Sequence, residues 1–490
     1  MAPRARLHLH ALVLVVGAAS LGTEIAAARL LAPFFGASTI VWANTIATVL
    51  LALAVGYWLG GRLADRRPTV GGLCRLVVLA AVALAATPLV ARPLLPVASR
   101  ALENVDAGGF LASLAAVLAL VAVPVLLLGM VAPYALRLSI VDVEHSGSTG
   151  GRLYAISTLG SLIGTFLAAL VLVPFAGTRL TFVVFALALL AAALPGDRRM
   201  ALLAVTAVAA SALLGAGPIK TGGGRVLYEV ETPYQYARVV QYGAVRKLEL
   251  NEGQAVHSQY EPGRFLTGDY WDDLLGAPLA VSGQIPASVA ILGNAAGTVA
   301  RGYGHFMPQT HVTGVEIDGE LTRIGRRFFD LRGPRMSLVT ADARPFLRTT
   351  SARFDAILVD AYRQPYIPFY LTTREFFAEA RARLTPTGTV AVNVGHPRGS
   401  DDLERVLTAT LRSEFGFVLR DPVRPTNTIL IAGLQRPRAS VAAPSGLART
   451  IQAMRQRLAP GLSGGAVFTD DHAPVEWLID GSLARYAGAD

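Results

Sequence analysis

The chain has 490 residues, of which 53% are hydrophobic and 16% are charged, and this composition excludes an ordinary soluble protein. The formal net charge is +10 at pH 7, but no basic run is interleaved with aromatic residues, so we expect no nucleic-acid partner. The arginines gather at the ends of apolar runs, which is typical of proteins that contact anionic lipid.

Seven apolar runs of membrane-spanning or slightly shorter length precede Pro218, and the last two are short. They cover residues 11–31, 40–60, 72–90, 110–134, 153–175, 180–194 and 200–214. They predict a transmembrane helical domain at residues 1–217 with about seven spans. Glu24 and Arg29 interrupt the first run and further runs follow it, so we do not interpret it as a cleaved signal peptide.

Glu24 and Arg29 need a reason, because a charge in hydrocarbon costs on the order of 3 kcal/mol or more unless it is paired or faces a cavity. One hypothesis is a polar path for a charged substrate. The alternative, which we favour, is an internal ion pair or a helix-end contact that fixes packing. Residues 56–67 place small residues ahead of a basic turn, which allows close contact between helices.

A glycine-rich linker at residues 215–224 separates the apolar part from a segment in which apolar and polar residues alternate. The runs 225–232, 236–243 and 244–253 each end in turn residues, and this pattern predicts β-hairpins. We therefore expect a small β-hairpin region at residues 218–285.

Residues 286–490 alternate between strand and helix patterns. They predict a Rossmann-like α/β domain with a parallel sheet, of the class I S-adenosyl-nucleoside transferase type. Four polar features follow predicted strands at their carboxyl ends, namely a turn that begins at Gly293 and the carboxylates of Glu316, Asp342 and Asp360. Open parallel sheets bind ligands at this edge, so the pattern indicates an enzyme that uses an S-adenosyl-type nucleoside.

The carboxylates at the second and third strand ends have separate interpretations. Glu316 lies 23 residues after Gly293, a spacing at which an acid accepts hydrogen bonds from ribose hydroxyls; the alternative is a solvated strand end. Asp318 is expected to cap the following helix. Asp342 either meets an adenine amino group or caps the helix that contains Pro345, and the pattern favours neither.

Asp360 ends a very apolar strand and precedes an irregular aromatic loop at residues 361–370, which includes Tyr362. A carboxylate placed there can hold an amine and take its proton, so we expect Asp360 to be catalytic. The alternative is that Asp360 only anchors the loop.

Several long runs together resemble a known family. They are residues 24–38, 56–66 and 151–177 in the apolar half, and 232–240, the VEID and ADAR segments, 359–377 and 469–478 in the other half. The chain resembles the spermidine synthases (polyamine aminopropyltransferases), specifically their membrane-fused bacterial branch, over nearly its whole length.

The resemblance implies transfer of an aminopropyl group from decarboxylated S-adenosylmethionine, a co-substrate, to a primary amine such as putrescine. It implies no metal and no permanently bound cofactor. It assigns Glu316 to the ribose, Asp342 to the adenine and Asp360 to the attacking amine. It also implies Gln235 for the nucleoside and Tyr234 and Tyr270 for the amine. The strand-end pattern adds Gly293 as a cofactor-binding and Tyr362 as a substrate-binding candidate. The expected partners are a small-molecule amine and the lipid bilayer, and a homo-oligomer remains open.

Two positions depart from the family pattern. Ala295 occupies the place of an acid in the first loop, and Arg363 occupies the place of an acid three residues after Asp360. A polyamine carries several positive charges and needs an acidic site, so these changes put putrescine in doubt. Asp269, Asp272, Glu375 or the cluster at 470–472 could replace the missing charge, although we favour an exposed turn for that cluster.

Two alternative functions remain. One is a methyltransferase-like enzyme, favoured by Ala295, and the other is a transporter or sensor with an inactive nucleoside-binding domain, favoured by Arg363. We expect a multi-pass protein of the cell membrane with a cytoplasmic catalytic domain. The arginine distribution with seven spans would instead place that domain outside, so we expect that one of the two short runs does not span.

Overall fold

The computed structural model describes residues 3–35, 39–101, 108–140, 144–214, 224–251, 256–362, 367–396, 398–438 and 443–479. The chain divides into two compact units. The first contains Met1–Gly222 together with Glu231–Tyr236, and the second contains Gly223–Val230 together with Ala237–Asp490.

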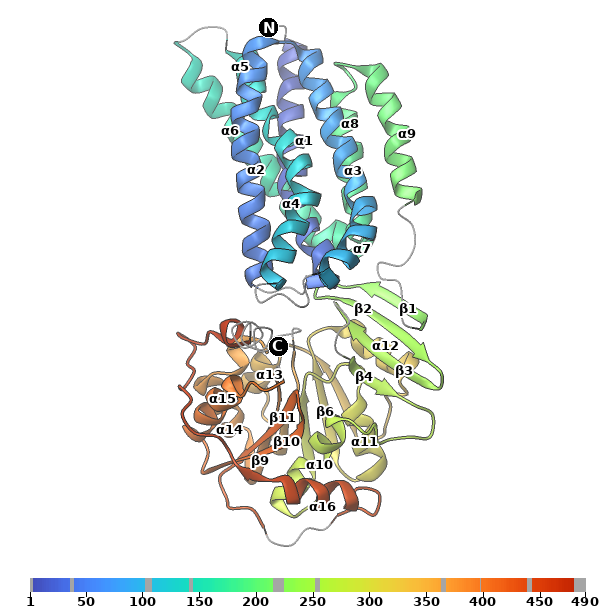
Figure 1. Ribbon diagram of the computed structural model, residues 1–490, viewed down its shortest axis with the longest axis vertical. Coiled ribbons are helices and arrows are strands. Elements are labelled where there is room, and N and C mark those ends of the chain that lie inside the picture. The colour runs from blue at the N-terminus through green and yellow to red at the C-terminus, as the bar shows by residue number, and fades with distance from the viewer. Residues whose placement is uncertain are drawn as a thin grey trace. The chain divides into compact units, whose positions relative to one another are not determined.

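The first unit is helical (Figure 1). Its elements are α1 (Pro3–Phe35), α2 (Thr39–Arg66), α3 (Val70–Ala101), α4 (Gly108–Gly129), α5 (Val131–Ser139), α6 (Ser146–Phe166), a π-helical segment (Leu167–Leu172), α7 (Val173–Ala176), α8 (Thr178–Ala193) and α9 (Arg198–Leu214). Within the described residues, five helical segments are long and apolar enough to cross a membrane. They are Ala5–Phe35, Val41–Arg66, Val70–Ala98, Ser113–Ser139 and Ser146–Ala176.

The prediction of about seven spans therefore exceeds the five long segments that the structure describes. The two short runs form α8, with 16 residues, and α9, with 17 residues. Sixteen helical residues extend about 24 Å, which is less than the hydrocarbon core of about 30 Å. Whether α8 and α9 cross a membrane therefore stays open, and the count of about seven spans stays a prediction.

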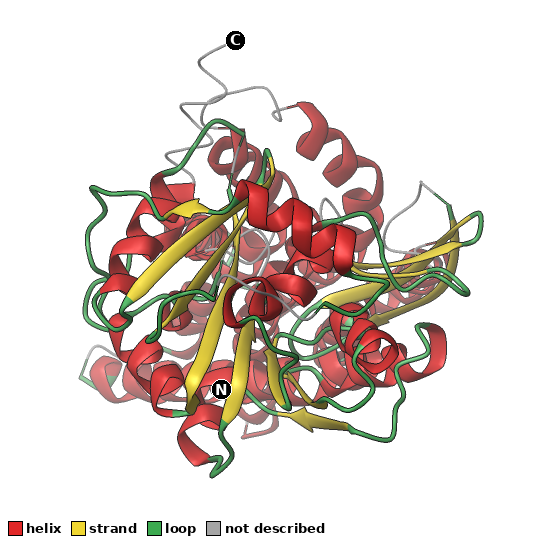
Figure 2. Cartoon of the chain, turned by 90° about the horizontal axis from the view of Figure 1, so that it is seen from below, coloured by secondary structure: helices red, strands yellow, loops and turns green. Residues whose placement is uncertain are grey.

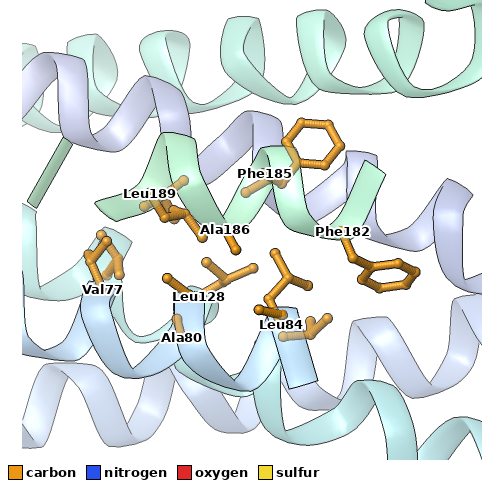
Figure 3. Packing of buried hydrophobic residues seen from close by; sticks show 14 of the residues in the cluster. Val77, Ala80, Leu84, Leu128, Phe182, Phe185, Ala186 and Leu189 are labelled. Carbon is orange, nitrogen blue, oxygen red and sulfur yellow. The ribbon is translucent and has the colours of Figure 1, made fainter. Parts of the chain in front are cut away.

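Large apolar side chains pack between α3, α4 and α8 in the helical core. Figure 3 shows α3 residues such as Leu84 facing α8 residues such as Phe182, with Leu128 of α4 between them. These three side chains are at most 2% exposed. Helix α8 is thus an integral part of the packed unit despite its length.

Glycines bring two pairs of helices into backbone contact. A β-carbon at Gly160 or Gly164 of α6 would collide with the carbonyl oxygen of Leu14 or Ala18 in α1, respectively. A β-carbon at Gly56 of α2 would likewise collide with a carbonyl oxygen of α4. Small residues allow such close approach, which agrees with the expectation for residues 56–67.

The second unit contains two sheets. The smaller has the order β1-β2-β3-β4, with β1 (Arg225–Glu231), β2 (Tyr236–Tyr242), β3 (Val245–Leu250) and β4 (Val256–Tyr260). The first three strands lie where the alternating pattern predicts them, and the pattern did not indicate β4. Helix α10 (Tyr270–Ser282) lies within the range predicted as β-hairpins, but it packs against the larger sheet because its buried side chains join the core beneath β9 and β11.

The larger sheet has eight strands in the order β12-β10-β11-β9-β8-β5-β6-β7. Figure 2 draws the strands in yellow and the helices in red. They are β5 (Ser288–Leu292), β6 (His311–Glu316), β7 (Met336–Thr340), β8 (Phe354–Val359), β9 (Leu384–Gly395), β10 (Phe417–Arg424), β11 (Asn427–Gly433) and β12 (Ala459–Pro460). Strands β5 to β9 pair in parallel, and β10 to β12 are antiparallel. This architecture confirms the predicted α/β class.

Helices cover both faces of this sheet. Helices α13 (Ala343–Thr349), α14 (Arg374–Ala382) and α15 (Asp402–Arg412) pack on one face, with Ala290 and Leu292 of β5. Helices α10, α11 (Thr298–Phe306) and α16 (Ala448–Arg457) pack on the other, with Val289 and Ile291. The alternation of side chains along β5 thus fills two cores, as expected for a buried parallel strand.

Candidate active site

Four polar features meet at one edge of the parallel strands. In the sheet register Leu292 pairs with Val315 of β6 and Val359 of β8, and Glu316 pairs with Thr340 of β7. The residues that follow these strands therefore lie side by side. They include the turn at Gly293 and the carboxylates of Glu316, Asp342 and Asp360, as the strand-end pattern predicted.

Gly293 lets the first loop pass directly over the end of β8. Its φ angle is +88°, which residues with a side chain rarely adopt. A β-carbon there would also collide with the backbone of Asp360 and Ala361. The loop then turns at Ala295, whose φ of +46° is uncommon for a residue other than glycine.

The Glu316 side chain is hydrogen-bonded to this loop. Its carboxylate oxygens accept hydrogen bonds from the backbone N–H of Ala295 at 2.8 Å and of Asp318 at 3.1 Å. Burial raises the pKa of Glu316 to about 7, although these backbone donors act in the opposite direction. A third backbone donor, the N–H of Ile317, also bonds to this carboxylate, and acceptance of ribose hydroxyls by Glu316 stays a prediction.

Asp318 and Asp342 both cap helices. The Asp318 side chain accepts from the N–H of Glu320 at 3.0 Å, at the start of α12 (Gly319–Phe328), as expected. Asp342 accepts from the N–H of Arg344 at 3.0 Å, at the start of α13. The hydroxyl of Tyr370 donates to its other oxygen at 2.8 Å. The capping alternative for Asp342 is therefore observed, and the adenine role stays a prediction.

Asp360 is surrounded by neutral hydrogen-bond donors. Asn393 Nδ2 donates to Asp360 Oδ1 at 2.8 Å, and the hydroxyl of Tyr270 lies 3.3 Å from Oδ2. Burial raises the pKa of Asp360 to about 7, while hydrogen bonds from Asn393, Tyr270 and Trp271 act to lower it. A carboxylate with this pKa can exchange a proton with a substrate near neutral pH.

The two predicted tyrosines of the second unit have different positions. Tyr270, the first residue of α10, contacts Asp360 directly, and burial raises its pKa well above the usual value. The Tyr362 hydroxyl instead donates to the carbonyl oxygen of Asn393 at 2.9 Å and accepts from the N–H of Gly395. Tyr362 therefore fastens the loop after β8 to β9.

Tyr234 and Gln235 lie in the turn between β1 and β2. They belong to the first compact unit, whereas Glu316 and Asp360 belong to the second. Their assignment to the amine and nucleoside parts of one site therefore stays a prediction. Arg363, which occupies the place of a family acid, lies outside the described residues.

The carboxylates considered as replacements for the missing acids have protein partners. Asp470 accepts two hydrogen bonds of 2.7 Å from the Arg344 guanidinium and one of 2.7 Å from Thr373. The 470–472 turn is thus anchored to α13 and α14. The other three carboxylates are also engaged: Asp272 by Thr267 and Gly268, Asp269 by Tyr270 N–H and Arg424, and Glu375 by Arg374 and Asp470 N–H.

The sequence analysis missed two residues that contact Asp360, namely Trp271 and Asn393. Asn393 lies near the carboxyl end of β9, the neighbour of β8, so the strand-end rule applied to Glu316 could have found it. Trp271 gave no such signal. In the part of the chain that is described, no group of three or more His, Cys, Asp and Glu side chains could hold a metal ion.

Comparison with known proteins identifies relatives. A probable polyamine aminopropyl transferase of Bifidobacterium longum is 34% identical over 190 residues, which cover 39% of this chain and 42% of that protein. A polyamine aminopropyltransferase of Vibrio vulnificus is 27% identical over 233 residues, covering 44% of this chain and 75% of that one. A solved structure of a probable spermidine synthase from Corynebacterium glutamicum has a TM-score of 0.37 and 21% identity, covering 50% of this chain and 98% of that chain.

No protein-family model matches the chain. The chain also spans less than half the length of the Bifidobacterium relative. The relatives nevertheless carry one name, and their name agrees with the resemblance seen in the sequence motifs. The α/β part of the chain is similar to proteins named polyamine aminopropyltransferase.

Proposed function

We propose that the α/β unit transfers an aminopropyl group from decarboxylated S-adenosylmethionine to a primary amine. The observation that carries this proposal is the position of Asp360, a half-buried carboxylate with a pKa raised to about 7, at the sheet edge where the loop of Gly293 turns. The relatives named as polyamine aminopropyltransferases support the reaction class.

The chemistry is a displacement at a carbon that a sulfonium activates. The amine nitrogen forms a bond to the aminopropyl carbon, the bond from that carbon to sulfur breaks, and neutral methylthioadenosine leaves. The attacking nitrogen loses one proton, which Asp360 in its ionised form accepts. Because the leaving group is already activated, the protein mainly aligns and desolvates the amine.

The side chains around Asp360 favour binding of a desolvated amine. Tyr270 and Trp271 present aromatic surface on one side, and the loop at Tyr362 is tied down on another. A desolvated site favours the neutral, nucleophilic form of an amine over its ammonium form. The ionised Asp360 then has one function, which is to orient this nitrogen and take its proton.

The acceptor is the finer part of the proposal. A diamine such as putrescine carries a second ammonium group, which needs a negative partner of its own. The carboxylates that could supply it, such as Asp272 and Asp470, are bonded to protein groups. We therefore expect putrescine to be a poorer acceptor than an amine with a neutral far end.

A methyltransferase-like reaction is the second candidate, and Ala295 favours it. The first loop carries a methyl group there instead of a carboxylate, and the backbone N–H of Ala295 donates to Glu316. An acid at this position would repel the carboxylate of ordinary S-adenosylmethionine, and the chain lacks that repulsion.

Mass spectrometry of reaction products tests both candidates. Purified full-length protein is incubated with either cofactor and with monoamines, putrescine and longer polyamines. An aminopropylated amine together with methylthioadenosine supports the first proposal. A methylated product together with S-adenosylhomocysteine supports the second, and the absence of both products refutes both. Asp360→Asn protein is the control for trace contaminating enzymes.

We also propose that the helical unit spans the membrane and that the α/β unit faces the cytoplasm. The five long segments and α8, whose side chains are buried between α1 and α3, together make an even number of crossings. Helix α9 begins at Arg198 and Arg199 and leaves most of its side chains exposed, as a helix at the membrane surface would. Both ends of the unit then lie on the arginine-rich side.

A topology reporter tests this placement. A reporter fused after Asp490 should be active only in the cytoplasm, and so should one placed in the arginine-rich segment at 62–67. If the C-terminal reporter is active on the outer side while the 62–67 reporter is cytoplasmic, α9 crosses the membrane and our placement is wrong.

A further inference from the structure

A chain of side-chain amides leads from the surface to Asp360. Thr426 Oγ1 lies 3.2 Å from Asn427 Oδ1, Asn427 Nδ2 lies 3.0 Å from Asn393 Oδ1, and Asn393 Nδ2 lies 2.8 Å from Asp360 Oδ1. We call Thr426, Asn427 and Asn393 the amide chain. It joins the neighbouring strands β11 and β9 and ends at Asp360, directly after β8, and burial increases along it from exposed Thr426 to Asn393, which is 2% exposed.

The hydrogen bonds of the amide chain all run in one direction. An ionised carboxylate can only accept, so Asn393 must turn its NH₂ group toward Asp360. Its oxygen then faces Asn427, which must donate in turn, and the oxygen of Asn427 receives the hydroxyl of Thr426. The charge of one carboxylate thus fixes the orientation of two amides, and each bond polarises the next.

We propose that Asn393 and Asn427 are positioning residues that hold Asp360 in its ionised, proton-accepting state. The groups that face Asp360 are the side chains of Tyr270, Trp271, Asn393 and, through its charge interaction, Tyr362. Among the described residues no lysine or arginine bonds to Asp360. The ionised form of Asp360 is therefore stabilised by neutral hydrogen-bond donors, whereas a nearby cation stabilises the ionised form of many other carboxylates.

A purely structural role is the alternative, because any buried amide needs hydrogen-bond partners. The two roles differ in what they change. A structural Asn427 would alter stability only, since its side chain bonds to Asn393 and not to Asp360. A positioning Asn427 would alter the titration of a carboxylate with which it has no direct contact.

Infrared titration of full-length protein measures this without any substrate. The protonated C=O band of Asp360 is isolated by subtracting spectra of Asp360→Asn, and its intensity is followed from pH 5 to 9. The wild-type midpoint should lie near the pKa of about 7. In Asn393→Leu the midpoint should rise by about one to two units, because a hydrogen bond to the charged form is lost. In Asn427→Leu it should rise by about half a unit, because Asn393 is then free to turn.

Thr428→Val is the matched control. Thr428 follows Asn427 in β11, and its hydroxyl bonds to Glu404 and His396 instead of the amide chain. This variant loses a buried hydrogen bond of the same strand, so it should leave the Asp360 midpoint unchanged. Equal midpoints in wild type, Asn427→Leu and Asn393→Leu would overturn the proposal. If Asn393→Leu does not fold, the shift in Asn427→Leu, compared with Thr428→Val, decides alone.

Only the catalytic consequence of this inference depends on the proposed function. If aminopropyl transfer occurs, the acidic limb of kcat/KM should move to higher pH in Asn427→Leu by the same amount as the infrared midpoint. A shifted midpoint in a protein that transfers no aminopropyl group would support the positioning role of the amide chain and refute the proposed function. Aminopropyl transfer with an unshifted midpoint would refute the positioning role of the amide chain and support the proposed function.

Discussion

The ends of β7 and β8 carry the same residue type in the same sheet, yet the two aspartates differ in what they can do. Asp342 at the end of β7 has one oxygen occupied by a helix N–H and the other by the Tyr370 hydroxyl. Asp360 directly after β8 is bonded by the side chains of Asn393 and Tyr270 instead. The two carboxylates therefore differ in their partners: Asp342 caps α13, whereas Asp360 caps no helix.

The largest expected difference between the two strand ends is in turnover. Asp360→Asn should lower aminopropyl transfer by at least about a hundredfold, because a general base typically contributes 10² to 10⁴ in rate. Affinity for methylthioadenosine should remain nearly unchanged. Asp342→Asn, in which the amide oxygen can still cap α13, is the matched control and should retain most of the turnover. Equal losses in both variants would contradict a special role for Asp360.

Glu316 extends the comparison to the end of β6. Glu316→Gln should weaken methylthioadenosine binding by about 1.5 to 3 kcal/mol, because hydrogen bonds from ribose to a charged acceptor become bonds to a neutral one. Isothermal calorimetry measures this loss. Glu320→Gln, at a glutamate that bonds to Tyr228, is the control and should bind normally. Unchanged affinity in Glu316→Gln would reject the ribose assignment.

The pH dependence of that affinity sharpens the assignment. The folded-state pKa of Glu316 is raised to about 7, so the free carboxyl is mostly protonated at pH 6 and mostly ionised at pH 8. Ribose hydroxyls that donate to it favour the ionised form, so affinity should increase as pH rises through 7. Calorimetry at pH 6, 7 and 8 should lose this trend in Glu316→Gln. A wild-type affinity that falls with rising pH would contradict the geometry.

The smallest expected effect concerns Asp342. Asp342→Ala should destabilise the α/β unit by about 1 kcal/mol through loss of the cap, measurable by chemical denaturation. If Asp342 also meets the adenine amino group, wild-type protein should prefer methylthioadenosine to methylthioinosine, which lacks that group. Asp342→Asn should then lose the preference. An Asn variant that discriminates like wild type would leave Asp342 with the cap alone.

The sequence predicted the sheet and its functional edge because strand periodicity is local. Gly293, Glu316 and Asp360 each end or follow a strand that burial makes apolar, so their meeting follows from the order of parallel strands. Whether such a side chain is also bonded to another protein group cannot be predicted from the neighbouring sequence. Whether Asp342 caps a helix or remains open depends on Tyr370, and whether Asp470 supplies negative charge depends on Arg344, which lies far from it in the sequence.

The number of spans was harder to predict for a different reason. The sequences of α8 and α9 are apolar, but an apolar sequence is equally typical of a short helix packed inside a bundle and of a helix on the membrane surface. Asn393 was missed because the strand-end rule was applied to carboxylates and not to an uncharged polar residue near the end of β9.

The glycine contact between α1 and α6 has a consequence for how the protein is made. Leu14 meets Gly160 and Ala18 meets Gly164, so the two helices run in the same direction, and their connection must contain the intervening helices. During synthesis α1 is complete long before its partner emerges from the ribosome. Until then the small-residue face at Gly17 and Ala18 lacks the partner that covers it in the folded unit. Substituting a larger residue at Gly160 or Gly164 should therefore affect co-translational assembly, and hence yield from cells, before it affects any chemistry at Asp360.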